Sequence, residues 1–318
     1  MRTKVFLLTS LLAGTFLAGC TATEEPVTEE GGKAIRITAG IGETSRAVID
    51  ADYASNLDIS FARLDNPATG TNWNTPSIEA VRTGGAGNTA ITFITKQNYL
   101  SDEGQSALIG YYPRKELENS TSNPVTVKYT LTGEEDIMAT EIQTGKLTDP
   151  FEAFTFRHLL TQLQFKCTGS ADAIKKWTAI SSIKVKDVAT SLTLALDKTE
   201  GASLTATGSA DQELSVENCP AVVSATDAEN PTTGYLMLYP VADMGTETAA
   251  ISLEVTATYG GNPKTQTVAI NNIDGGVKAG HSHLITLTFA EDGTIAAEAG
   301  IAEWQPGNGG GSTVIPGA

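Results

Sequence analysis

The sequence predicts an all-β fold of two tandem β-sandwich domains that follow an export signal. Apolar residues recur at every second position far more often than at every third or fourth, which is the period of a half-buried strand. Turn segments rich in Gly, Asn and Pro separate these short patterns along most of the 318 residues. A chain of this length exceeds the comfortable size of one hydrophobic core, which favours two domains.

The N-terminus has the features of a lipoprotein signal. Arg2 and Lys4 precede an apolar stretch that ends in small residues immediately before Cys20. The stretch has about 14 residues, whereas a helix needs about 20 to cross a bilayer, so a transmembrane anchor is disfavoured. We expect a signal peptide over residues 1–19, cleavage between Gly19 and Cys20, and acyl chains such as palmitate on Cys20.

The N-terminal half follows a short connecting segment. Residues 20–33 are rich in glutamate and poor in apolar side chains, which predicts a flexible lipidated stalk. The N-terminal β-sandwich domain is then expected over residues 34–149. Its strands are predicted from short alternating or apolar runs that end at turn residues. They are residues 34–39, 57–62, 91–94, 107–112 and 125–131.

A second β-sandwich domain is expected over residues 150–318. It begins where Phe151, Phe154 and Phe156 concentrate apolar area in a few positions. Further short runs separated by turns favour a sandwich in this half as well. They are residues 183–186, 192–196, 235–239, 251–255, 267–270 and 284–289.

Charge and cysteine content exclude several classes of protein. The chain has 37 acidic and 21 basic residues and a net charge of −16, which disfavours nucleic acid and anionic membrane surfaces as partners. Cys167 and Cys219 are the only cysteines after Cys20, too few for a disulfide framework. An exported compartment would allow one bond between them. Their separation cannot be deduced from the sequence, so the bonded and the free state both stay open.

The sequence contains no constellation of residues that indicates an enzyme. Its histidines are His158, His281 and His283, and it has no nucleophile elbow, phosphate-binding loop, dinucleotide fingerprint or zinc-protease motif. His281 and His283 alternate at the start of a predicted strand, but no further ligand completes a metal site. We interpret these two as turn residues, and His158 as a hydrogen-bonded core or turn histidine. No catalytic residue, metal or cofactor is expected.

The tryptophans offer a weaker indication of ligand binding. Trp73, Trp177 and Trp304 are widely separated and could stack on sugar rings, although single tryptophans are more often packing residues. Glycan binding therefore remains an alternative function, with an exposed Trp73 as its platform.

Seven short segments occur in a characteristic order along the chain. The most distinctive is Phe156–Leu163, which contains a Phe-x-His-x-Leu-x-x-Leu pattern. The others are the motif ending at Cys20 and residues 44–47, 136–139, 235–240, 279–287 and 301–307. With these segments in this order, the chain resembles the fimbrillin-like lipoproteins that build the type V pili of Bacteroidales.

The resemblance implies a fold and a route of assembly. Each domain would be a transthyretin-like β-sandwich, and the lipoprotein precursor would be carried to the outer membrane. There an arginine-specific protease removes the first strand, and the terminal strand of a neighbouring subunit fills the resulting groove. By this resemblance, the corresponding cut here would fall between Arg46 and Ala47, although Arg63 and Arg82 have similar polar surroundings in the sequence.

The resemblance implies a donor strand in the C-terminal region, where residues 294–297 and 300–304 precede a glycine-rich tail. Thr313, Val314 and Ile315 form its apolar triplet, although this end could also be merely frayed. The leading hypothesis is a structural subunit of a surface pilus, or fimbrium, with a role in adhesion, whose partners are other pilus subunits. The alternative is a permanently lipidated surface protein that binds a glycan or host ligand without polymerising. Shaft, tip and anchor roles are not separable by sequence.

Overall fold

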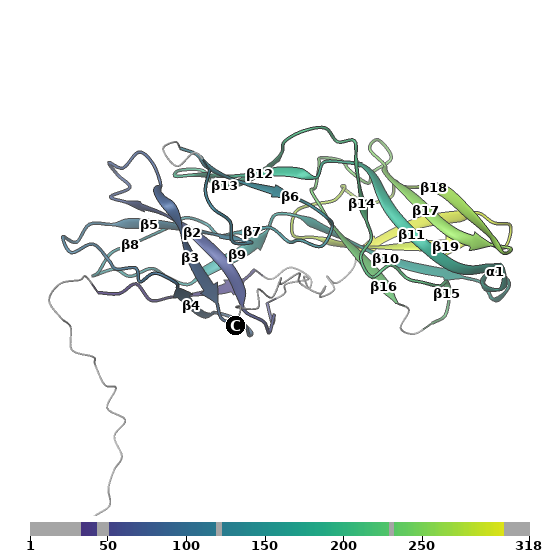
Figure 1. Cartoon of the computed structure of the whole chain (residues 1–318), viewed down its shortest axis with the longest axis horizontal. Helices are drawn as coiled ribbons and strands as arrows, with labels where there is room; N and C mark the ends of the chain where they lie inside the picture. The colour runs from purple at the N-terminus through teal and green to yellow at the C-terminus, as the bar shows by residue number, and fades with distance from the viewer. Residues whose placement is uncertain (1–32, 43–50, 119–122, 229–231, 302–318) are drawn as a thin grey trace, which may run out of the picture. The chain divides into compact units, whose positions relative to one another are not determined.

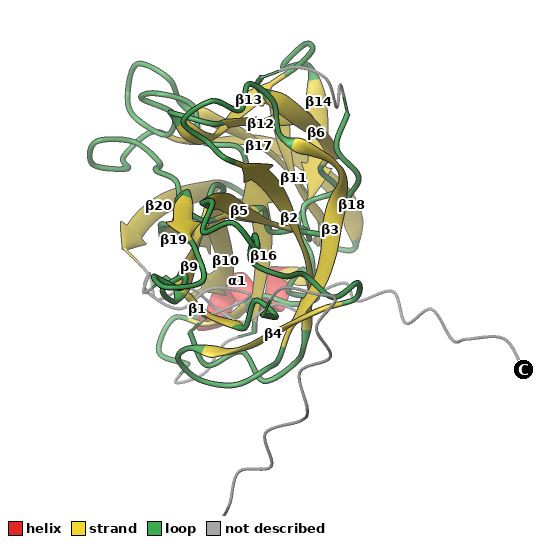
Figure 2. Cartoon of the chain, turned by 90° about the vertical axis from the view of Figure 1, so that its left-hand side faces the viewer, coloured by secondary structure: helices red, strands yellow, loops and turns green. Residues whose placement is uncertain are grey.

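The computed structural model describes residues 33–42, 51–118, 123–228 and 232–301. Regular structure in these residues is almost entirely β-strand, and their single helix, α1 (Ala171–Lys176), has six residues (Figure 2). The predicted all-β class is therefore confirmed. None of the helical structure in these ranges is long and apolar enough to span a membrane.

The largest sheet has eight strands and contains most of the N-terminal half (Figure 1). Its order is β2-β3-β4-β1-β9-β7-β5-β8, and an additional pairing of β2 with β5 closes the ladder on itself. Because the ladder is closed, β1 is an interior strand. The strands are β1 (Ile37–Ile41), β2 (Leu57–Asp65), β3 (Asn74–Arg82), β4 (Thr89–Phe93), β5 (Ser106–Tyr112), β7 (Met138–Ala139), β8 (Gln143–Gly145) and β9 (Phe154–His158).

The remaining strands form three smaller sheets. In the first, β10 pairs with β15, β16 and β19, and β20 pairs with β19 alone. The other two have the orders β14-β11-β17-β18 and β13-β12-β6. The strands are β6 (Val125–Thr130), β10 (Thr161–Gly169), β11 (Trp177–Val188), β12 (Ser191–Asp197), β13 (Gly201–Ala206), β14 (Gln212–Ser215), β15 (Ser224–Ala225), β16 (Thr233–Leu238), β17 (Ile251–Tyr259), β18 (Asn262–Ile270), β19 (Ser282–Phe289) and β20 (Ile295–Ile301).

Side-chain alternation accounts for most of these strands. In β6 and β17 every second residue is buried, because one face of each strand covers the core while the other is more open to solvent. In β5 six consecutive residues are buried, which explains why its sequence is a continuous run of apolar and small residues.

Several contacts join the two halves of the chain across residue 150. β6 pairs antiparallel with β12, with Tyr129 opposite Leu192. Trp73 Nε1 donates a hydrogen bond of 2.9 Å to Leu196 O. Buried apolar residues from both halves belong to one contiguous core, and the described residues form one compact unit. The division into domains at residues 149 and 150 stays a prediction.

Candidate functional site

The first strand of the described chain is held between two strands from distant parts of the sequence. β1 pairs antiparallel with β4, with Ile37 opposite Ile91. On its other side β1 pairs parallel with β9, with Ala39 opposite Phe154. We call the position between β4 and β9 the β1 slot. It is the candidate functional site because the closure of the large sheet depends on the strand that fills it.

Backbone hydrogen bonds extend the pairing of β1 beyond both of its ends. On the N-terminal side, Ile35 N donates to Gln97 O at 2.8 Å. On the C-terminal side, Gly42 N donates to Phe156 O at 2.7 Å. The segment that occupies the slot therefore extends at least from Ile35 to Gly42.

The side chains of this segment fill an apolar trench. Ile35, Ile37 and Ile41 are each 5% exposed, and Ala39 is fully buried. The neighbouring strand contributes the fully buried rings of Phe154 and Phe156, which pack edge-on against Phe61 with centroid separations of 5.3 and 6.4 Å. Burying three isoleucine side chains stabilises the filled slot by several kcal/mol, at roughly 1.5–3 kcal/mol each.

A buried arginine holds the backbone of the strand in the slot. The Arg82 guanidinium is fully buried, and its Nε donates to Ala39 O at 2.9 Å. Its remaining nitrogens donate to the carbonyls of Thr83, Gly85 and Gly87 at 2.9–3.3 Å. Burial lowers the pKa of Arg82 below its ordinary value. Four carbonyl oxygens, rather than a carboxylate, thus compensate for the cost of burying this charge.

One glycine of the strand lies directly beside a side chain of the loop that follows β3. A Cβ atom at Gly40 would lie 2.6 Å from Asn88 Oδ1, closer than non-bonded atoms approach. Gly40 is directly next to Ala39, whose carbonyl Arg82 binds. The slot therefore binds a backbone carbonyl at one residue, and at the next residue an added side chain would have to displace the Asn88 amide.

Replacing this glycine is expected to loosen the strand. Gly40→Val should lower the free energy of unfolding by about 1–3 kcal/mol, because the added atoms overpack the contact with Asn88. Urea denaturation of the two proteins measures the difference. Asn88→Ala in the same chain should recover most of the loss, since it removes the obstructing amide. Unchanged stability in Gly40→Val would show that the space is not restricted.

Most of the site residues predicted from the sequence lie outside the described residues. They are Gly19, Cys20, Arg46, Ala47 and the triplet at residues 313–315. Lipidation, processing and the donor tail therefore stay predictions.

The expectation that Arg63 and Arg82 have polar loop surroundings like those of Arg46 is wrong. Arg82 is fully buried at the end of β3, as described above. Arg63 is 8% exposed within β2, where its Nε forms an ion pair of 2.7 Å with Asp65 and its Nη2 donates to Ser106 Oγ. Because both side chains are held in the sheet, neither site is open to a protease in the folded protein.

The proposed sugar platform is also wrong. Trp73 is 2% exposed and Trp177 is 1% exposed. The indole N–H of Trp177 donates to Ala290 O at 2.8 Å, much as that of Trp73 donates to Leu196 O. Both rings are packing residues with satisfied donors. Trp304 lies outside the described residues, so the described residues offer no exposed tryptophan to a glycan.

Cys167 and Cys219 are free thiols in the structure. Burial raises the pKa of the Cys167 thiol, and the nearby Cys219 adds to the shift. A thiol of this kind is protonated and unreactive at neutral pH. The sequence left the bonded and the free state open, and in the described structure the two thiols are not joined.

The histidine of the distinctive Phe-x-His segment is a core residue, as interpreted from the sequence. His158 Nδ1 forms a hydrogen bond of 2.6 Å with Asp136 Oδ2, and both side chains are fully buried. The pair connects β9 with the segment that precedes β7. Within the described residues, no three His, Cys, Asp or Glu side chains are grouped so that they could hold a metal ion.

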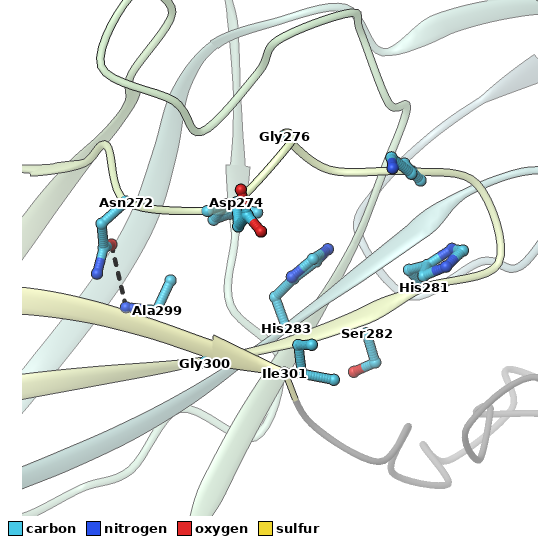
Figure 3. A pocket seen from close by; sticks show the side chains of 11 residues that line it. Asn272, Asp274, Gly276, His281, Ser282, His283, Ala299, Gly300 and Ile301 are labelled. Carbon is cyan, nitrogen blue, oxygen red and sulfur yellow. Dashed lines mark hydrogen bonds between the residues drawn. The ribbon is translucent and has the colours of Figure 1, made fainter.

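A pocket of about 280 Å³ lies beside the other two histidines (Figure 3). His283 is 8% exposed, and its buried Nε2 has no hydrogen-bond partner in the described structure. His281 is exposed and its Nδ1 lies 3.0 Å from Ala279 O. Burial lowers the pKa of His283 below its ordinary value, and His281 adds to the shift.

His283 is expected to make stability depend on pH. Because the pKa of His283 is lower in the folded protein than its ordinary value of 6.5, the unfolded chain binds more protons as the pH falls through that value. The free energy of unfolding should therefore fall as the pH drops from about 7 to 5. His283→Gln should make this dependence shallower in urea titrations at several pH values. His281→Gln should leave most of this pH dependence in place, because burial contributes more than His281 to the lowered pKa of His283.

Solved structures share this fold. A candidate cell adhesion protein from Bacteroides uniformis aligns with a TM-score of 0.59 and 18% identity, covering 88% of this chain and all of that one. A second, from Bacteroides ovatus, has a TM-score of 0.57 and 18% identity, covering 87% of this chain and 99% of that one. At 18% identity, the similarity shows a shared fold and carries no information on function. No curated protein matches the sequence.

The sequence itself is more specific about the family. Residues 30–304, which make up most of the chain, match the model of the fimbrillin-like family. The protein belongs to the fimbrillin-like family, and this confirms the resemblance seen in the seven segments. Membership places it among the pilus and adhesion subunits of the cell surface.

Proposed function

We propose that the protein is a structural subunit of a surface pilus, without catalytic activity, that polymerises by strand exchange after removal of its N-terminal strand. The observation that supports this proposal is the position of β1, which lies between β4 and β9 in a closed sheet. Membership of the fimbrillin-like family supports the same assignment.

The backbone pairing explains why an emptied slot would bind another strand. Without β1, the facing edges of β4 and β9 would each expose unpaired N–H and C=O groups beside the apolar trench. An incoming strand satisfies both edges and covers the trench, as in other cases of β-strand addition. The intact precursor is inert because its own strand fills the slot.

The cut at Arg46–Ala47 would release all of β1. The strand ends at Ile41, upstream of Arg46, and the sheet resumes with β2 at Leu57. The released piece would carry Cys20 and its lipid, so an outer membrane lipoprotein precursor becomes a lipid-free subunit of the fimbrium. An arginine-specific protease and other pilus subunits are the partners in this scheme.

Cleavage of the purified precursor tests the proposal. Treatment with an arginine-specific protease should give a product that starts at Ala47 and assembles into polymers, as followed by mass spectrometry, gel filtration and light scattering. Arg46→Lys preserves the positive charge but removes the cleavage site, so this variant should stay monomeric. A product that starts at Ala47, has lost the released peptide and remains monomeric would contradict strand exchange.

A further inference from the structure

The pocket beside His281 and His283 is formed by two separate parts of the chain. One side is the end of the β19–β20 ladder, where His283 lies opposite Ile301. The other side is the loop between β18 and β19, which contributes Asn272 and Asp274. The volume of about 280 Å³ lies just below the range of roughly 300–1,000 Å³ that holds drug-sized ligands. The pocket therefore has room for one ring-sized molecule.

The loop that forms one wall of the pocket is held against the rest of the fold. Ile273 N donates to Gly245 O at 2.9 Å. Val277 N donates to Met244 O at 2.9 Å, and the side chains of Ile273 and Val277 are both buried. Gly276, which lies between them, has a φ of 69°, a conformation that glycine adopts without a steric cost. The wall is thus in place before a ligand enters, so little ordering entropy opposes binding.

His283 brings an unsatisfied polar group to this pocket. Figure 3 shows its ring projecting from β19 toward the loop that carries Asp274 and Gly276. The residue is 8% exposed, and its Nε2 has no hydrogen-bond partner among the described residues. A buried polar atom without a partner is costly, and a ligand atom that bonds to it removes the cost. The nitrogen therefore favours a ligand with polar groups.

Two further side chains add one donor and one acceptor. Asn272 Oδ1 accepts a hydrogen bond of 3.1 Å from Ala299 N, drawn in Figure 3, which leaves the amide NH₂ group as a donor. His281 Nδ1 lies 3.0 Å from Ala279 O. Because a carbonyl oxygen only accepts, Nδ1 carries the hydrogen, and Nε2 of the neutral ring is an acceptor. The pocket thus offers both kinds of hydrogen-bonding group to a ligand.

The charges in the lining of the pocket have opposite signs. Asp274 contributes a carboxylate and Lys278 an ammonium group, and neither has an ion-pair partner within the described part of the chain. Burial lowers the pKa of His283, which favours its neutral form. The net charge of the whole chain is −16, which disfavours an anionic ligand. The pocket is therefore suited to an uncharged molecule.

We propose that this pocket binds one neutral sugar ring, the terminal residue of a glycan. Each sugar hydroxyl both donates and accepts hydrogen bonds, which matches the mixture of amide, imidazole, carboxylate and ammonium groups. The C–H groups of the ring would lie against Ala299 and Ile301 of β20, and Ile301 is 93% exposed without a ligand. The site does not use Trp73 or Trp177. It is also independent of strand exchange, because none of its residues belongs to β1, β4 or β9.

Titration of free hexoses into the uncut precursor tests the proposal. Glucose, galactose and mannose are added separately, and binding is followed by saturation-transfer NMR and calorimetry. At least one of them should bind with a dissociation constant on the order of 1 mM, as expected for a ligand of this size. The uronate of the hexose that binds best has the same ring but carries a carboxylate. It should bind at least tenfold more weakly.

Two substitutions locate the binding site. His283→Phe keeps a planar ring and removes the unsatisfied nitrogen, so the thermal midpoint without sugar should not fall, whereas sugar affinity should fall at least tenfold. Asp274→Ala removes an exposed carboxylate and should weaken binding to a similar degree without affecting the fold. Asp149→Ala is the matched control, because it removes an exposed carboxylate between β8 and β9. It should bind the sugar as the wild type does.

Each contrary result has a distinct meaning. Binding that survives both His283→Phe and Asp274→Ala would place the sugar elsewhere and overturn the proposal. The absence of saturable binding for all three hexoses would overturn it as well. Tighter binding of the uronate would show that Lys278 selects an anion, which contradicts an uncharged ligand. None of these results bears on strand exchange, since the β1 slot is unchanged in every variant.

Discussion

Arg82→Met is expected to lower the free energy of unfolding by about 3–5 kcal/mol, the cost of breaking a buried, hydrogen-bonded charge network. Methionine has a similar length but no donor, so the four carbonyls that the guanidinium binds lose their shared partner. One of them is Ala39 O, so β1 should also loosen. Urea denaturation gives the free energy of unfolding. Amide hydrogen exchange in residues 35–42 shows whether the backbone hydrogen bonds of β1 open more often.

A matched variant controls for the loss of a charge. Arg157 is 64% exposed and its Nη1 pairs with Glu141 at 2.7 Å on the surface. Exposed pairs contribute about 0–1 kcal/mol, so Arg157→Met should change stability by no more than that. Equal losses in the two variants would show that Arg82 has no special role in holding the slot.

Phe61→Ala is the second substitution with a large expected effect. Phe61 is fully buried, and its ring packs edge-on against Phe93, Phe154 and Phe156 at centroid separations of 5.3–6.4 Å. Removing it leaves a cavity behind β9, which forms one wall of the slot. The loss should be about 3–5 kcal/mol, as for other buried aromatic residues truncated to alanine.

An exposed apolar residue provides the comparison for this second variant. Ile94 is 59% exposed just after β4, so Ile94→Ala should change the free energy of unfolding by less than about 0.5 kcal/mol. Thermal and urea unfolding of the three proteins under identical conditions give the values. A loss below about 1 kcal/mol in Phe61→Ala would mean that the aromatic cluster relaxes to fill the cavity.

The sequence predicted the strands that alternate between core and solvent. The runs at residues 57–62, 125–131 and 251–255 lie in β2, β6 and β17, because a period of two is a local property. β3, β13 and α1 were not predicted. β3 contains Pro76 and polar residues, which weaken the pattern, and α1 is too short to show a helical period.

The essential features of the slot are non-local and were therefore missed. Arg82 precedes a glycine-rich loop, which on sequence grounds favours a solvated side chain, and its four acceptors become evident only once the chain folds around it. The burial of Trp73 against Leu196 likewise depends on a contact across the two halves.

The most direct test of strand removal is the N-terminal sequence and intact mass of the protein recovered from native cell surfaces. Strand exchange predicts that subunits in high-mass polymers start at Ala47, and that an Arg46→Ala variant starts at an acylated Cys20 and forms no polymers. An acylated Cys20 at the start of the wild-type protein, whether polymers are present or not, would contradict processing and leave a permanently lipidated surface protein.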